Sequence, residues 1–346
     1  MNRKSVFIAA TLLIAGLAGE AAQAKRWGCW IQADRNVRIR NTASNASQAV
    51  SDWNNLTILN LSSVSSGEET YVFNANSGNT GWGGLASITN YSGCTILRAT
   101  AQLNTYYSWT ANAARGVHCQ EVGHTFGLDH SNDGGCMGGG YWYDIGTHYQ
   151  IVQGNINEIG SMYANRVAGS SMESVNEGHE EEGGTPRFHA FWYHHPRTLR
   201  QATRQASDVV IARVTSISEG DAIETAYPDG SGVQRIPTQR VSFEVTSSRK
   251  GSLGVNESFV LFQNGNEENR FDEDPSYKVG KAYLLFLTPR EDGTYLVLSP
   301  EGRYEVTKKG LVPAAQKGFA KDLAGAKLQD VISDVTRAVA AADEQE

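Results

Sequence analysis

The spacing of apolar and polar residues predicts a first region that mixes helices and strands. Residues 37–40 alternate as a half-buried strand does, whereas Ala46, Val50 and Trp53 recur at helical spacing. This mixture is typical of an α+β domain. Further strands are expected at residues 71–73, 86–88 and 99–103, and further helices at residues 111–127, capped by Thr110, and at residues 155–164.

A second region follows a stretch that lacks apolar periodicity. Residues 166–186 are rich in Gly, Ser and Glu, so we interpret them as a flexible acidic linker. Beyond them, short apolar segments separated by turns predict a small antiparallel β-barrel, similar to an OB-type domain, with a terminal helix. We therefore expect two domains, at residues 25–165 and 187–346. The strands of the second are expected at residues 209–214, 241–245, 259–262, 282–287 and 295–298, and its helices at residues 197–202 and 319–341.

The first residues predict a secretory signal peptide. Basic Arg3 and Lys4 precede an apolar run at residues 6–18, and residues 22–24 (Ala-Gln-Ala) supply the small side chains of a cleavage site. The apolar run is shorter than the roughly 20 residues that a membrane-spanning helix needs. No later segment is apolar enough to span a bilayer. We therefore expect residues 1–24 to be removed and the protein to be secreted, to an extracellular or periplasmic location.

Composition narrows the class of partner. The chain has 346 residues, 40% of them hydrophobic and 19% charged, which is typical of a soluble protein with room for two cores. Its formal net charge is −7, and it has no clustered stripe of Lys and Arg, so we do not expect nucleic acid as a partner. A protein or peptide substrate remains open, and we expect a monomer.

One short run carries the residue types of a metal-dependent hydrolase. At about 100° per residue, Gln120 and His124 lie on the same face of a helix, so both side chains can meet one ion. Glu121 projects beside that ion, which suits a general base. Gly127 permits the helix to end in a left-handed turn, so that His130 reaches the same ion.

Residues 120–130 resemble the zinc signature of the metzincin metallopeptidases, HExxHxxGxxH, and more narrowly that of the bacterial matrixin-like branch. Cys136 and Met137 are similar to the continuation of that branch into its Met-turn, whose methionine lies beneath the metal. The resemblance covers about residues 27–165. It implies a twisted mixed sheet with an active-site helix and a C-terminal helix.

The resemblance also implies an activity. It predicts a secreted endopeptidase that holds one catalytic Zn²⁺ and hydrolyses peptide bonds with metal-activated water. His124 and His130 would be zinc ligands, and Glu121 would be the general base. By the same resemblance, residues 83–88 would form the edge strand against which an extended peptide pairs.

Gln120 departs from the signature, because it stands where the first zinc-binding histidine is expected. His118 lies about 240° from His124 around the helix, and Cys119 also faces away, so neither replaces it. Gln120 then either ligates zinc through its amide oxygen or leaves the position to water, and zinc affinity should fall. The alternative to a weakly metallated peptidase is a pseudo-peptidase that acts as a secreted protein-binding module.

Four cysteines permit three pairings. A bond between Cys119 and Cys136 would connect the helix to the Met-turn. Closing a loop of about 15 to 20 residues contributes roughly 3 kcal/mol to the free energy of unfolding. Cys29 would then pair with Cys94. The alternative is that Cys29 is a latency thiol on zinc, as in matrixin pro-segments, but this leaves one cysteine unpaired, so we favour two disulfides.

A histidine-rich tract at residues 188–196 has a weaker meaning. It contains His189, His194 and His195, and such tracts can bind metal. Because no thiol or carboxylate accompanies them at matching spacing, we favour packing and surface roles. The second domain permits targeting, substrate capture or self-inhibition, and fold analogy alone assigns none of them.

Overall fold

The computed structural model describes residues 26–131, 134–138, 148–166, 187–315 and 318–343. The predicted signal peptide lies outside these residues, as does all of the predicted linker except Arg166. Within the described part of the chain, no helix is long and apolar enough to cross a membrane.

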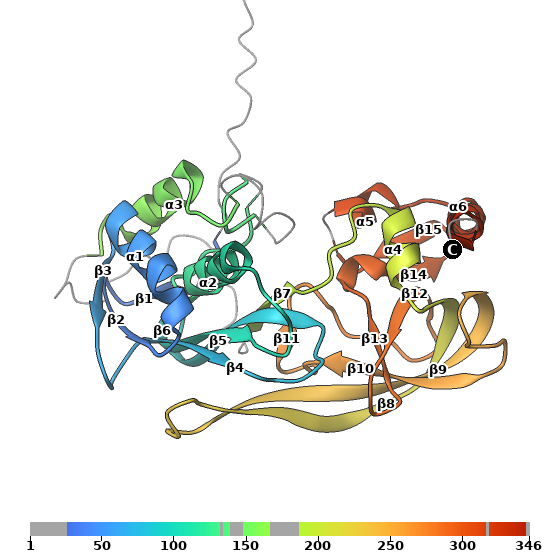
Figure 1. Ribbon diagram of the computed structural model, residues 1–346, viewed down its shortest axis with the longest axis horizontal. Coiled ribbons are helices and arrows are strands. Elements are labelled where there is room, and N and C mark those ends of the chain that lie inside the picture. The colour runs from blue at the N-terminus through green and yellow to red at the C-terminus, as the bar shows by residue number, and fades with distance from the viewer. Residues whose placement is uncertain (1–25, 132–133, 139–147, 167–186, 316–317, 344–346) are drawn as a thin grey trace, which may run out of the picture.

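The first unit is a mixed sheet with helices on one face (Figure 1). The sheet has eight strands in the order β11-β7-β5-β6-β4-β2-β3, with β1 beside β6. The predicted strands and helices of this region are confirmed, and so is the α+β class. The elements are β1 (Ile31–Gln32), β2 (Asn36–Asn41), α1 (Ser47–Leu56), β3 (Asn60–Ser63), β4 (Thr70–Ala75), β5 (Trp82–Ser92), β6 (Thr95–Asn104), α2 (Ala111–Thr125) and α3 (Gln153–Tyr163).

The core of this unit lies between the helices and the sheet. Trp53 of α1 is fully buried against α2, and its indole nitrogen donates a hydrogen bond to the carbonyl oxygen of Cys119 at 2.9 Å. Val117, Val122 and Phe126 of α2 and its C-terminal turn are buried in the same cluster. Burying these apolar side chains fixes the position of α2 over the sheet.

Both predicted disulfides are present. Cys29 bonds Cys94 with 5.4 Å between their Cα atoms, and Cys119 bonds Cys136 with 5.9 Å between theirs. The alternative in which Cys29 is a free latency thiol is therefore wrong.

The second unit is built on a closed barrel, as predicted. Five strands form the ring, because β13 pairs with both β10 and β12. Its pairings are antiparallel except for that of β10 with β13. The elements are α4 (Leu199–Gln205), β8 (Asp208–Ala226), β9 (Val233–Lys250), β10 (Ser258–Asn264), β12 (Ala282–Pro289), β13 (Tyr295–Val297), β14 (Arg303–Thr307), β15 (Gly310–Pro313), α5 (Gly318–Asp322) and α6 (Leu328–Asp343).

The single closing helix predicted at residues 319–341 is instead two helices. α5 ends at Asp322 and α6 begins at Leu328. Gly325 lies between them with φ +75°, a conformation that interrupts a right-handed helix.

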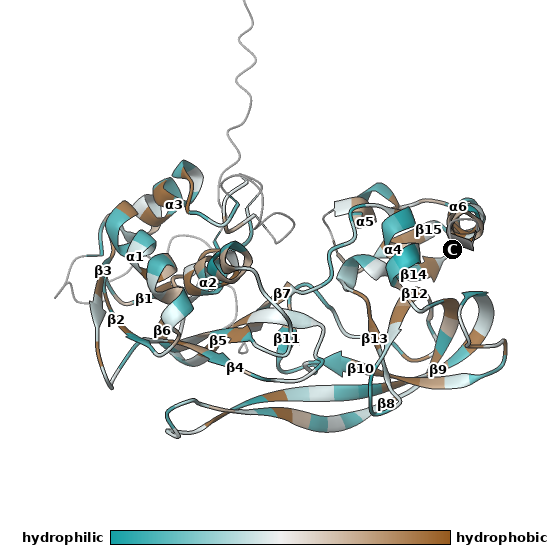
Figure 2. Ribbon diagram, viewed as in Figure 1, coloured by the Kyte–Doolittle hydropathy of each residue, from teal (hydrophilic) through white to brown (hydrophobic). Residues whose placement is uncertain are grey.

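The long ribbon of β8 and β9 extends from the barrel under the first sheet, on the face opposite its helices (Figure 1). Hydrophobic and hydrophilic residues are mixed along this ribbon (Figure 2). Tyr227 at its tip packs against Tyr71 and Phe73 of β4. Gln234 donates hydrogen bonds to the hydroxyls of Ser87 and Thr100, at 3.0 and 3.1 Å. The ribbon therefore attaches the second unit to the first sheet.

Two strands that follow the predicted linker belong to the first sheet. β7 (Arg187–Trp192) pairs antiparallel with β5, and β11 (Arg270–Phe271) pairs parallel with β7. The prediction that residues 83–88 form an edge strand is therefore wrong, because β7 takes up the outer side of β5 in this region.

Candidate metal centre

The position of the candidate ligands depends on where α2 begins and ends. Thr110 caps the helix by accepting a hydrogen bond from the Ala113 amide at 3.2 Å, as predicted. At the other end, the amide of Gly127 bonds the carbonyl oxygen of His124, and the amide of Leu128 bonds that of Gly123. These two bonds form a Schellman motif, which reverses the chain after the helix.

Gly127 is required at that reversal. Its φ is +88°, and a Cβ atom there would collide with the backbone carbonyl of Trp30. The turn brings His130 back toward His124, so that their ring centroids are 4.9 Å apart. The expected role of Gly127 as the residue that ends the helix is confirmed.

Gln120 lies on the same face as His124, as its spacing predicts. Its amide nitrogen is 2.5 Å from Nε2 of His130 and 3.5 Å from Nε2 of His124. The amide is buried and close to both imidazoles, but the atom nearest them is its nitrogen, which donates hydrogen bonds and does not ligate a metal.

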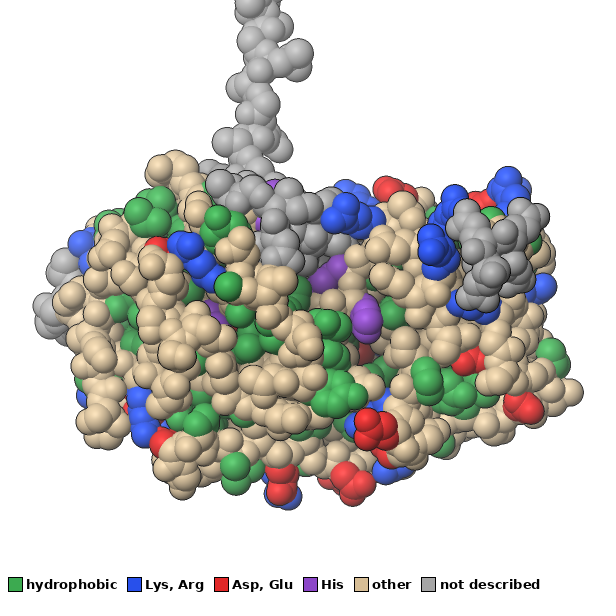
Figure 3. All heavy atoms as spheres, in the orientation of Figure 1, with side chains coloured by type: hydrophobic (Ala, Val, Ile, Leu, Met, Phe, Trp, Pro, Cys, Tyr) green, Lys and Arg blue, Asp and Glu red, His purple; other side chains and the backbone are tan. Residues whose placement is uncertain are grey.

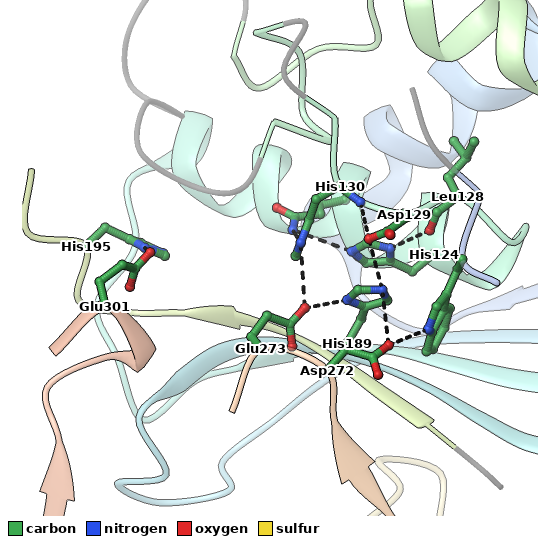
Figure 4. Close-up of polar contacts among 11 residues, drawn as sticks. His124, Leu128, Asp129, His130, His189, His195, Asp272, Glu273 and Glu301 are labelled. Atoms are coloured by element: carbon green, nitrogen blue, oxygen red, sulfur yellow. Dashed lines mark hydrogen bonds and ion pairs between the residues drawn. The ribbon is translucent and has the colours of Figure 1, made fainter. Parts of the chain in front are cut away.

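His189 of β7 lies beside His124 and His130. Packing alone, the role that we favoured for His189, therefore does not describe its position. One ligand atom from each of His124, His130 and His189 lies within 4.8 Å of the others, which is close enough to bind one metal ion. The ring of His189 stacks on that of His124 with centroids 4.2 Å apart (Figure 4). Its position could not be inferred from the linear spacing of the histidine-rich tract.

The Nδ1 atoms of the three clustered histidines face oxygen acceptors. Nδ1 of His124 is 2.7 Å from the carbonyl oxygen of Leu128, which only accepts, so Nδ1 carries the proton. Nδ1 of His189 is 2.5 Å from Oε1 of Glu273, and Nδ1 of His130 is 3.6 Å from the same oxygen (Figure 4). Metal-binding histidines typically use their second nitrogen in this way, as His124 and His189 do. Nε2 of His189 lies 3.3 Å from Oδ1 of Asp129, so a bound ion would compete with that contact. The three side chains thus fit a metal ion.

Glu273 and Asp129 make the position of His189 electrostatically negative. Burial opposes a charge on His189, but these two carboxylates outweigh it and raise its pKa to about 10. Burial would also raise the pKa of Asp129, yet its contact with His189 lowers that pKa to about 2. The site therefore favours a positive charge, which either a proton or a metal cation supplies.

Glu121, the predicted general base, is fully buried under β5. It packs against Gly84, where a Cβ atom would lie 2.5 Å from its Oε1. Neither carboxylate oxygen has hydrogen-bond geometry to any described residue, although the amides of Ala86 and Phe191 are near enough to favour the charged form. Burial dominates and raises the pKa of Glu121 well above its usual value.

Met137 lies against the helix that carries the histidines. It is fully buried, and its sulfur packs where Gly123 has no side chain. The Ser131 amide bonds the carbonyl oxygen of Met137 at 2.7 Å, just after His130. With the Cys119–Cys136 bond, this contact holds the Met137 segment to α2.

The other candidate histidines lie elsewhere. His118 contacts Asn45 at 3.1 Å, and burial lowers its pKa to about 3, so it is separate from the cluster, as predicted. Nδ1 of His195 lies 4.0 Å from Glu301, on the side away from the three clustered histidines (Figure 4). Histidine side chains are visible near the middle of the face shown in Figure 3, between the two units.

Glu273 was not identified from the sequence. It lies in an acidic stretch whose spacing to His189 is not local. β11 pairs with β7 and thereby brings Glu273 to the cluster.

No protein-family model matches the chain, and no curated protein is significantly similar to it.

Proposed function

We propose that this chain is a secreted zinc-dependent endopeptidase. The observation that carries the proposal is the cluster of His124, His130 and His189 beside Glu121. Two of these histidines, the glutamate and the helix-ending glycine keep the spacing of the metzincin signature. Imidazole is a preferred ligand of Zn²⁺, and the second nitrogens of His124 and His189 already contact acceptors.

The protein groups have separate tasks in this proposal. His124, His130 and His189 would hold the ion, with the Gln120 amide beside them. Zinc, when bound, polarises a carbonyl and lowers the pKa of water. Glu121 would accept a proton at its carboxylate and pass it to the leaving amine. Burial raises the pKa of Glu121, which makes its carboxylate a stronger base for the first of these steps.

A pseudo-peptidase that only binds proteins is the second candidate. The substitution of Gln120 for a histidine and the burial of Glu121 favour it. A binding module has no chemical need for a carboxylate beside the histidines, however, and burying a carboxylate is costly. Retention of Glu121 therefore favours the peptidase.

Zinc content and casein hydrolysis test the proposal together. We expect one zinc ion per purified chain, slow cleavage of unfolded casein, and loss of cleavage with a chelator or with Glu121→Gln. His124→Ala should remove both zinc and cleavage. The matched control is His194→Ala, a histidine outside the cluster, which should change neither. Absence of zinc at micromolar metal, or cleavage that survives Glu121→Gln, contradicts the proposal.

A further inference from the structure

β7 pairs with the side of β5 that lies beside the candidate metal centre. Peptides commonly bind a sheet by adding a strand to an exposed edge. The side of β5 that faces away from β6 is taken by β7, from Trp82 to Ser87. We propose that β7 occupies the place of the substrate, so that the described chain is a closed, self-inhibited form. This inference rests on the proposed peptidase function.

The pairing of β7 with β5 continues through the metal centre. Leu85 lies opposite Ala190, and Ala86 lies opposite His189. The ladder uses backbone N–H and C=O groups of β5 that a peptide would otherwise bind. His189 is thus the residue of the strand that meets the cluster, in the position that the centre of a bound peptide would take.

His189 is also held there by segments other than β7. Glu273 lies 2.5 Å from Nδ1, and Asp129 lies 3.3 Å from Nε2. Trp27 packs on the ring with centroids 4.4 Å apart, and its indole nitrogen donates to Asp272 at 2.9 Å. A substrate carbonyl would need the space beside His124 that this ring fills.

The general base is covered in the same arrangement. Glu121 has no exposed surface, and its nearest backbone amides belong to Ala86 of β5 and Phe191 of β7. A base that accepts a proton from water must be reached by water. Moving β7 away would uncover one side of this carboxylate, since Phe191 lies on that strand.

Two segments that follow β7 in the chain contact it. β11 pairs with β7 beside the cluster, and Ile236 of the ribbon is buried in one apolar cluster with Phe188 and Ala190 of β7. Opening therefore requires β7 to separate from β5 while the ribbon remains attached, or the whole second unit to move. In either case His189 would leave the ion, which His124, His130 and the amide oxygen of Gln120 would then hold, and the segment after the linker acts as the inhibitor.

A disulfide that locks β7 onto β5 tests the inference. Leu85 and Ala190 are direct partners, and cross-strand neighbours lie at Cα distances that a disulfide spans. We expect Leu85→Cys with Ala190→Cys to lower casein hydrolysis at least tenfold at unchanged zinc content. Ala190→Cys alone is the matched control. Hydrolysis by the locked chain at the rate of this control overturns the inference, because β7 would then remain in place during catalysis.

An opened variant should have the opposite effect. Gln120→His supplies a third imidazole from α2, so His189→Ala can be added without leaving only two histidines. We expect the double variant to hydrolyse casein at least tenfold faster than Gln120→His at equal zinc content. Equal or slower hydrolysis overturns the inference and identifies His189 as a ligand that the working enzyme needs.

Casein binding in a Glu121→Gln background separates the two proposals, because it requires no turnover. We expect the locked chain to bind labelled casein at least tenfold more weakly than the opened chain. Equal binding overturns self-inhibition. If binding differs as expected while no variant with Glu121 intact cleaves casein, the peptidase proposal fails and β7 still blocks a peptide-binding edge.

Discussion

The two halves of the candidate metal centre are built in different ways. The helix-and-turn half comes from one continuous run, in which α2, the Gly127 turn and His130 follow each other along the chain. The strand half is assembled from distant segments, with His189 on β7 and Glu273 just after β11. The first half is positioned by local geometry, whereas the second depends on how two units dock.

The two halves contribute different groups to the candidate site. The helix-and-turn half sets the spacing of two imidazoles and of Glu121, the proposed general base. The strand half adds a third imidazole and the carboxylate that orients it, and it covers the site at the same time. Four substitutions can sharpen or break this division, and they follow from the largest expected effect to the smallest.

Gly127→Ala should have the largest effect on stability, because Gly127 lies at the turn that reverses the chain after α2. The added Cβ atom meets the Trp30 carbonyl at a φ that disfavours side chains. We expect a loss on the order of 3 to 4 kcal/mol in the free energy of unfolding, measured by urea denaturation. Gly160→Ala in α3 is the matched control, since its Cβ atom meets nothing within 4 Å. Equal effects of the two changes would contradict the assigned role of Gly127.

Removing the Cys119–Cys136 bond should have the next largest effect. Replacing both residues by Ser releases a link across 17 residues and should lower the free energy of unfolding by about 3 kcal/mol. Zinc affinity should fall as well, because the bond ties α2 to the Met137 segment. Replacing Cys29 and Cys94 instead should destabilise the fold with less effect on zinc affinity. Equal zinc affinity in the two double variants would break this distinction.

Glu273→Ala tests the strand half alone. Loss of a carboxylate that orients a metal-binding histidine typically costs 10- to 100-fold in metal affinity. We expect a fall of that size in zinc affinity by competition titration, with an unchanged circular dichroism spectrum. Glu267→Ala, on the same segment but outside the cluster, is the control. Unchanged zinc affinity would mean that the helix-and-turn half binds the ion without help.

Thr110→Ala should have the smallest effect. It removes the cap of α2 and should lower the free energy of unfolding by about 1 kcal/mol. Because the cap lies at the opposite end of α2 from the histidines, zinc affinity should stay within twofold. Thr110→Ser keeps the capping oxygen and should restore the stability. A large loss of zinc affinity would show that the ends of α2 are coupled.

The same division explains which parts of the fold and of the candidate site could be predicted from the sequence. Thr110, Gly127 and the face shared by Gln120 and His124 follow from helix periodicity and turn chemistry, which depend on near neighbours. The barrel follows from the alternation of its strands. The pairing of β5 with β7 could not be predicted from the sequence, because strand pairing across a linker is decided by packing between units. The sequence therefore favoured packing and surface roles for the histidine-rich tract that contains His189, and it did not single out Glu273.

The late position of β7 and β11 in the chain has a consequence for the order in which the protein is made. Segments emerge from synthesis from the N-terminus onward, and early domains fold first. α2 and the turn after it, with His124 and His130, are complete long before Glu273 exists. A nascent chain thus carries two of the three histidines with β5 still uncovered, and both the third imidazole and the cover arrive only after more than half of the polypeptide has been made.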